Sequence, residues 1–136
     1  MIRRIEHGGT LIAVVVPRDH QPASGGIEFY TPNELSQQLA CMTWPAGHTI
    51  PAHVHKDVPR AVVHTLEALF VRSGRLRVDL YDEERVFVGT EELVGGDVIL
   101  LAAGGHAITM LEPTVIVEIK QGPYAGVEDK ERFVPR

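Results

Sequence analysis

The 136-residue chain is poor in cysteine and in clustered positive charge. A single cysteine, Cys41, excludes an internal disulfide framework. Lysine and arginine together number 13 against 18 aspartates and glutamates, and no basic run is longer than the pair Arg3-Arg4. A nucleic-acid groove needs a basic face that displaces counterions from phosphates. We therefore expect no nucleic-acid partner.

Long apolar runs are also missing. The longest, residues 11–16, is far too short to cross a bilayer. The first six residues lack the apolar stretch of a secretion signal. We therefore expect no membrane partner and a cytoplasmic location.

Helical periodicity is scarce as well, and the one weak helix candidate is 33–38. Thirteen glycines and nine prolines instead divide the chain into short pieces, a pattern typical of sandwiches and barrels. We expect one all-β domain over residues 1–136, with a core at about 36–120 and an irregular tail at 122–136. The expected strands are apolar or alternating, and they are 11–16, 39–44, 62–71, 76–81, 98–101, 106–111 and 114–120.

Two of these strands make specific predictions about side-chain direction. Strand 76–81 alternates strictly and should form a hairpin with 62–71 around the turn at Gly74. In 62–71, Glu67 shares a face with Leu69 and Val71, so all three would point to the same side. In 114–120, Glu118 and Lys120 share a face that we expect to point to solvent.

Histidine carries the main chemical signal. His53 and His55 are one residue apart, so on a strand both imidazoles would lie on one face. Glu67 follows inside an apolar stretch, where an unpaired carboxylate is costly. His106 follows Gly96-Asp97 and a buried strand. Three imidazoles and one carboxylate suit a divalent transition metal.

Chance has to be weighed against this interpretation. The chain has seven histidines, so a His-x-His pair alone is a weak signal. The alternative is two surface histidines beside a proline-rich loop. The glycine before the pair, the glutamate in an apolar strand and the third histidine together favour the metal.

At this point the pattern resembles the cupin superfamily. The stretch Gly47-x5-His53-x-His55-x11-Glu67-x6-Gly74 is similar to the first cupin motif, and Gly96, Gly104 and His106 are similar to parts of the second. The resemblance covers residues 36–120. It implies a small antiparallel jelly-roll β-barrel with His53, His55, Glu67 and His106 as metal ligands in its wide end.

Several positions depart from the cupin pattern. Eleven residues separate His55 from Glu67, where three or four are usual. Ala102 replaces a proline, Met110 stands where asparagine is common, and His106 comes one residue early. If the strand is bulged, His64 would replace Glu67 or His106 as a ligand.

The inserted residues 56–61 are a candidate lid, because long loops at a barrel mouth often have this role. Lys56 and Arg60 could then meet an anionic group of a substrate. The alternative is a solvated loop with incidental charges. Which metal is bound cannot be inferred, since Fe, Mn, Ni, Co, Cu and Zn all suit this donor set.

The resulting expectation is a metal-dependent enzyme that acts on a small polar molecule by dioxygenase, isomerase or lyase chemistry. The alternative is a module that binds or senses a small molecule without turnover, since one fold supports both. The resemblance also implies a homodimer. Its physical support is the apolar strand 11–16, which needs cover on both faces.

Overall fold

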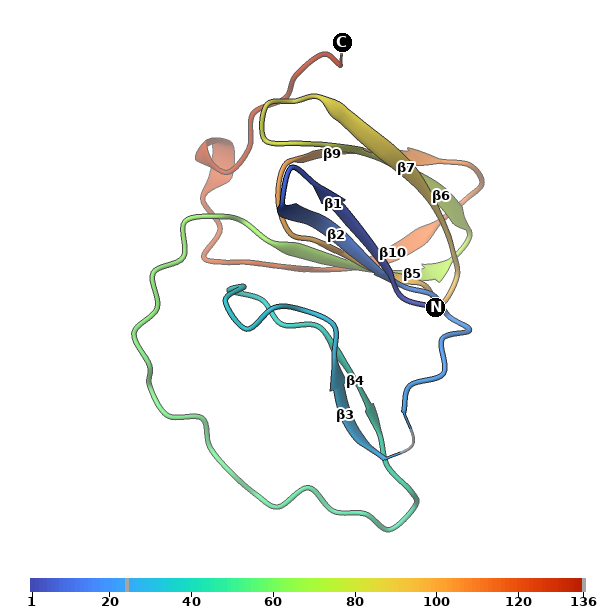
Figure 1. Cartoon of the computed structure of the whole chain (residues 1–136), viewed down its shortest axis with the longest axis vertical. Helices are drawn as coiled ribbons and strands as arrows, with labels where there is room; N and C mark the ends of the chain where they lie inside the picture. Colours follow the sequence, from blue (N-terminus) through green and yellow to red (C-terminus); the bar gives the residue numbers. More distant parts are fainter. Residues whose placement is uncertain (24, 136) are drawn as a thin grey trace.

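The computed structural model describes residues 1–23 and 25–135, and these form an all-β structure in which every strand pair is antiparallel (Figure 1). Within this part of the chain no helix has the length and hydrophobicity needed to cross a membrane. The elements are β1 (Arg3–His7), β2 (Thr10–Val16), β3 (Gly26–Phe29), β4 (Ala40–Thr43), β5 (Glu67–Ser73), β6 (Arg75–Tyr81), β7 (Phe87–Val94), β8 (Val98–Leu101), β9 (Gly105–Met110), β10 (Val115–Lys120) and the single-turn 3-10 helix η1 (Gly126–Glu128).

Two larger sheets enclose the main core. One has the order β1-β2-β8-β5-β10 and the other the order β7-β6-β9, while β3 and β4 form a separate pair. Apolar residues from β2, β5 and β8 meet those from β6 and β7 between the sheets. In β6 the predicted alternation is confirmed, because Leu76, Val78 and Leu80 are fully buried in this core. Burial of such side chains is the main favourable contribution to folding.

Strand β2 is buried on both faces, as its apolar run 11–16 predicts. Ala13 and Val15 face the main core. Val14 and Val16 face a second cluster, in which Tyr30 is the large buried side chain. The connection between β3 and β4 therefore supplies much of the cover that β2 needs within the same chain.

The turn between β5 and β6 requires its glycine. Gly74 has a φ of 94°, a left-handed conformation that side chains rarely adopt. A Cβ at this position would also collide with the backbone carbonyl of Pro113. The predicted hairpin of these two strands is wrong, because the turn carries the chain from one sheet to the other: β5 pairs with β8 and β10, whereas β6 pairs with β7 and β9.

Strand β10 runs along β5 with one irregularity. Val115 pairs with Ser73, but Ile116 pairs with Val71, so Arg72 is left without a partner. This is a β-bulge. Beyond it, Glu118 lies opposite Leu69 and Lys120 lies opposite Glu67.

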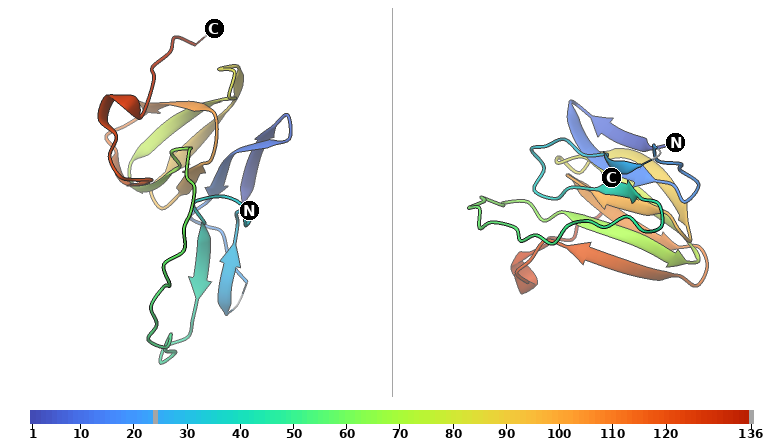
Figure 2. Two further views of the ribbon diagram at one scale, coloured as in Figure 1. Left: turned by 90° about the vertical axis from the view of Figure 1, so that its left-hand side faces the viewer. Right: turned by 90° about the horizontal axis from the view of Figure 1, so that it is seen from below.

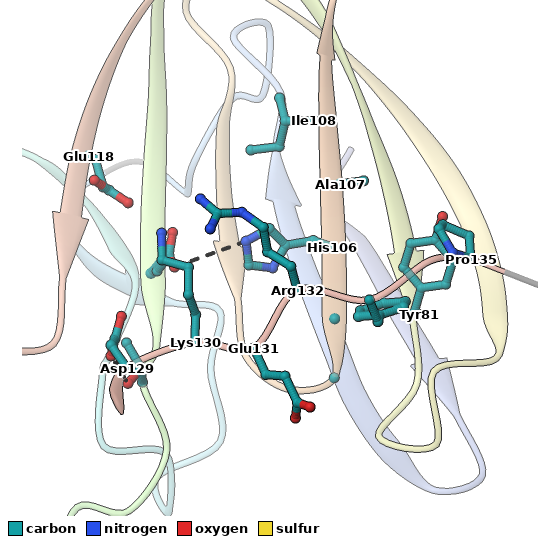
Figure 3. Close-up of a pocket in the computed structure, with 15 residues that line it drawn as sticks. Tyr81, His106, Ala107, Ile108, Glu118, Asp129, Lys130, Glu131, Arg132 and Pro135 are labelled. Carbon is teal, nitrogen blue, oxygen red and sulfur yellow. Dashed lines mark hydrogen bonds and ion pairs between the residues drawn. The ribbon is translucent and has the colours of Figure 1, made fainter. Parts of the chain in front are cut away.

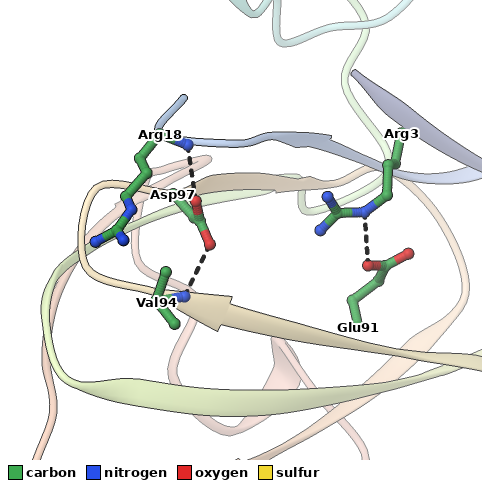
Figure 4. A network of polar contacts seen from close by, with 5 residues as sticks. All are labelled: Arg3, Arg18, Glu91, Val94 and Asp97. Atoms are coloured by element: carbon green, nitrogen blue, oxygen red, sulfur yellow. Dashed lines mark hydrogen bonds and ion pairs between the residues drawn. The ribbon is translucent and has the colours of Figure 1, made fainter. Parts of the chain in front are cut away.

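A buried aspartate fixes the turn before β8. Asp97 is only 6% exposed, and its two carboxylate oxygens accept hydrogen bonds from the backbone N–H groups of Arg18 and Val94, each at 2.8 Å (Figure 4). Nearby, Arg3 donates to Glu91 at 2.9 Å and links β1 to β7. Asp97 therefore joins the chain after β2, the end of β7 and the start of β8.

Several expected elements differ in the structure. The predicted strand 62–71 begins only at Glu67, and the predicted helix 33–38 is a series of turns. Strands β1, β3 and β7 were not expected from the sequence. In β1, four of the five residues are exposed, so this edge strand lacks the apolar pattern from which a strand is predicted.

Residues 44–65, which we call the arm, contain no strand, and all 22 are exposed. The arm begins after β4 and runs as a long open excursion away from the two larger sheets before it returns to β5 (Figures 1 and 2). Among the described residues, its only backbone–backbone hydrogen bond joins His48 N to the Pro45 carbonyl at 3.2 Å. The arm is thus the least supported part of the molecule.

Candidate metal centre

A cavity of about 850 Å³ lies at one end of the two larger sheets. Strands β5 and β10 contribute one wall, β6 and β9 contribute another, and the chain after η1 crosses between them (Figure 3). The lining residues are Thr65, Glu67, Tyr81, Gly104, Gly105, His106, Ala107, Ile108, Glu118, Asp129, Lys130, Glu131, Arg132, Phe133 and Pro135.

Two of the predicted ligands meet in this cavity. Glu67 is the first residue of β5, and His106 is the second residue of β9, opposite Leu80. They come from different sheets, yet Oε1 of Glu67 and Nε2 of His106 are 4.0 Å apart (Figure 3). Their side chains are 18% and 30% exposed, respectively, so solvent can still reach both.

The cavity shifts both groups toward their neutral forms. Burial, followed by the neighbouring carboxyl group of Glu118, raises the pKa of Glu67 to about 7. Burial also lowers the pKa of His106, and the positive charge of Lys130 lowers it further. A neutral imidazole is the form that binds a metal ion. Near pH 7, His106 is therefore in the binding form, while Glu67 titrates.

Glu118 also belongs to the site, which was not predicted. It is exposed, but it lines the cavity beside Glu67. The alternation of β10 places Glu118 and Lys120 on one face, as expected, but only the pairing register with β5 shows that this face lines the cavity. Lys120 forms a 2.7 Å ion pair with Asp129 of the tail.

The irregular tail forms part of the cavity wall. The ring of Phe133 packs edge-on against Tyr81, with centroids 5.2 Å apart, and the guanidinium of Arg85 lies 5.3 Å from the centroid of Phe133. The ring fits because Gly105 has no side chain, since a Cβ there would lie 2.9 Å from Phe133. Apart from η1, residues 122–135 of the tail have no regular structure, as expected.

The other two predicted ligands lie in the arm. His53 and His55 are exposed neighbours with ring centroids 5.3 Å apart, and they are not on a strand. Nδ1 of His53 lies 2.8 Å from the Pro51 carbonyl. Because a carbonyl only accepts, this contact favours the tautomer with the proton on Nδ1, in which Nε2 of His53 is the nitrogen that can bind a metal.

The four predicted ligands therefore fall into two pairs, Glu67 with His106 and His53 with His55. In the described part of the chain, no three histidine, cysteine, aspartate or glutamate side chains are arranged to hold a metal. The remaining candidates His64, Lys56 and Arg60 are exposed in the arm and do not line the cavity. The metal ligands and the lid stay predictions. No family model, no curated protein and no solved structure matches this chain.

Proposed function

We propose that this protein is a cupin-like jelly-roll protein that binds a divalent transition metal through His53, His55, Glu67 and His106. The observation that carries the proposal is the meeting of Glu67 and His106 in one cavity from two different sheets. These residues are 39 positions apart in the sequence, and both belong to the same predicted ligand set.

The donor chemistry of this pair fits such an ion. Imidazole nitrogen and carboxylate oxygen, which His106 and Glu67 present 4.0 Å apart, are donors that would hold a first-row divalent metal. The set has no thiolate, because Cys41 packs in the second apolar cluster. Histidine and carboxylate ligands without thiolate are compatible with Fe, Mn, Ni, Co, Cu or Zn.

Backbone conformation supports the cupin-like part of the proposal. Two antiparallel sheets face each other around the main core, as a jelly roll requires. The glycines at the four positions that resemble the cupin motifs also have positive φ, a conformation that glycine adopts at no steric cost. These are Gly47 at 86°, Gly74 at 94°, Gly96 at 98° and Gly104 at 71°.

A catalytic role on a small polar molecule is the function that we favour. A bound metal would supply a Lewis acid or a redox centre at this position. Glu118 favours catalysis over simple binding, because it places a second titratable group beside the ligand Glu67. The dioxygenase, isomerase and lyase classes all remain within this proposal.

Metal titration tests the central claim. Purified protein is stripped with a chelator and titrated with Co²⁺, whose visible absorption reports the ligand set. We expect His106→Ala to weaken Co²⁺ binding at least about tenfold, since even loss of an outer-shell partner has an effect of that size. His7→Ala is the matched control, because His7 is exposed and pairs with Asp82 outside the cavity. Equal binding by both variants, or no binding by the wild type, would refute the proposal.

A second measurement separates catalysis from passive binding. A catalytic metal keeps at least one coordination position for water or substrate, whereas a closed site does not. We therefore expect Mn²⁺-loaded protein to enhance the relaxation of water protons strongly. An enhancement no greater than that of a Mn²⁺ ion shielded from solvent would favour the binding module.

A further inference from the structure

The arm holds two donors of the proposed metal site but has almost no contacts of its own. All of its residues are exposed, and Val54 and Val63 are 88% and 86% exposed. Burying such side chains is favourable, and exposed apolar groups concentrated in one segment indicate a surface that something covers. An arm of 22 residues with one internal backbone hydrogen bond is therefore incomplete in the single chain.

The cavity is bordered by two open sheet edges. In the described residues β9 pairs only with β6, and β10 pairs only with β5. Each strand thus presents a row of unpaired N–H and C=O groups, which is a template for an added strand. His106 lies on one of these edge strands and Glu118 on the other. A strand added at β9 would run directly beside the candidate site.

An apolar surface continues from these edges. On the face of β5 and β10 opposite Glu67, Phe70, Val117 and Ile119 are 40–59% exposed. The hairpin of β3 and β4 carries further exposed apolar side chains, Ile27, Phe29, Met42 and, just beyond it, Trp44. One chain thus presents both an apolar sheet face and an apolar hairpin, and two copies related by a two-fold axis could cover both reciprocally.

The start of the arm is anchored to the body at a point outside the cavity lining. Tyr30 is buried against Val14 and Leu100, and its carbonyl accepts a 2.8 Å hydrogen bond from Arg4. From this anchor β4 extends away from the two larger sheets, and beyond it the arm turns and runs back to β5 (Figure 2).

The last residue of the arm, Thr65, lines the chain's own cavity and donates a 2.8 Å hydrogen bond to Asp129. The stretch that holds His53 and His55 is exposed and does not line this cavity, so it is open to a second copy.

We propose that two copies of this chain exchange their arms, so that His53 and His55 of one copy complete the site of Glu67 and His106 in the other. The inference rests on the proposed metal-binding function and names the partner that this site requires. Residues around His53 would pair along β9 of the second copy. His53 and His55 would then share the inward face with His106, and Val54 would share the outward face with Ala107.

Complementation between two defective variants tests the exchange. One variant carries His53→Ala and His55→Ala, and the other carries Glu67→Ala and His106→Ala. Neither has a complete site alone. When the two are unfolded and refolded together at equal concentration, half of the dimers are mixed, and each mixed dimer has one intact site. We expect Co²⁺ binding with the wild-type spectrum at about one quarter of the wild-type sites.

The outcomes separate the exchange from the proposed function. If the wild type binds Co²⁺ and the refolded mixture does not, each arm serves its own chain, and the exchange is wrong while the metal site stands. If the wild type binds no Co²⁺, the proposed function fails, and a metal-independent measurement decides the exchange.

That measurement is a cross-link in a Cys41→Ser background. Chains carrying Val54→Cys are mixed with chains of a different size carrying Ala107→Cys, and the mixture is refolded and oxidised. We expect a disulfide-linked product of one chain of each kind. The control replaces Val54→Cys by Val127→Cys, which is equally accessible because Val127 is 95% exposed. A yield no higher than that of the control would overturn the exchange.

Discussion

The two-sheet body and the arm differ in almost every physical respect, although each holds half of the proposed metal ligands. In the body, Leu76 and Ile99 are completely buried, and each strand is paired on at least one side. In the arm, every residue is exposed and one backbone hydrogen bond is formed. The comparison shows that a motif which is continuous in sequence can span one region that folds by itself and another that does not.

The largest expected effect is the loss of stability when an apolar side chain of the body is truncated, compared with the same kind of truncation in the arm. Leu76→Ala should lower the free energy of unfolding by about 2–5 kcal/mol, because it removes a buried side chain and leaves a cavity. Val63→Ala in the arm should change it by less than about 0.5 kcal/mol in dilute protein. Urea unfolding measures both values. A comparable loss in Val63→Ala would mean that the arm is packed at the concentration used.

A smaller loss is expected from the turn that closes the body. Asp97→Ala leaves the part-buried N–H groups of Arg18 and Val94 without their acceptors, and we expect a total loss of about 1–3 kcal/mol because solvent can partly replace the carboxylate. Asp97→Asn keeps one acceptor oxygen and should be less destabilising. Thermal unfolding of the two variants gives the order. If both variants lose the same stability, the negative charge of Asp97 stabilises the turn, and the number of hydrogen bonds that its side chain accepts does not matter.

The tail offers a local test of the cavity wall. Gly105→Ala forces the ring of Phe133 away from its position, and such overpacking typically costs about 1–3 kcal/mol, less where the displaced group lies in a tail. We expect the tail to become more sensitive to limited proteolysis while the global unfolding midpoint moves little. Gly89→Ala is the control, because a Cβ there meets nothing within 4 Å. Equal proteolysis of both variants would show that the Phe133 contact does not hold the tail.

A pH-dependent effect concerns the charge of Glu67 in metal-free protein. The pKa of Glu67 is about 7 in the folded chain against an ordinary value of 4.5, so the folded chain binds the proton more tightly. Stability should therefore fall as the pH rises from about 4.5 to about 7. Glu67→Gln removes this penalty and should raise the melting temperature more at pH 8 than at pH 4.

Thermal unfolding in the presence of a chelator measures this difference. Glu34→Gln, an exposed substitution outside the cavity, is the control. A pH-independent effect of Glu67→Gln would mean that burial and Glu118 do not act on this carboxyl group in solution.

Local patterns predicted much of the body. The bounds of β8 match the predicted 98–101, and the alternation of β6 predicted which side chains enter the core. The shared face of Glu67, Leu69 and Val71 is confirmed, since Leu69 and Val71 are buried in the main core and Glu67 faces the cavity below them. These predictions succeeded because they depend on the period of a single strand.

The parts that could not be predicted depend on contacts between distant segments. The direction of Glu118 depends on its register with β5, and the place of Phe133 depends on space left by Gly105. The sequence predicted a strand for residues 62–66 because Val62 and Val63 favour strands, yet a strand needs a partner to pair with. In the single chain that partner is missing, so propensity alone did not produce the structure.

The bulge at Arg72 has a consequence for the chemistry of the cavity. Without that one unpaired residue, pairing that continued from Val115 and Ser73 would bring Glu118 opposite Phe70. Glu118 would then lie on the apolar outer face, and Val117 and Ile119 would enter the cavity, because a shift of one residue turns every side chain of a strand over. A single inserted residue far from Glu67 therefore determines whether the cavity wall beside Glu67 is acidic or apolar.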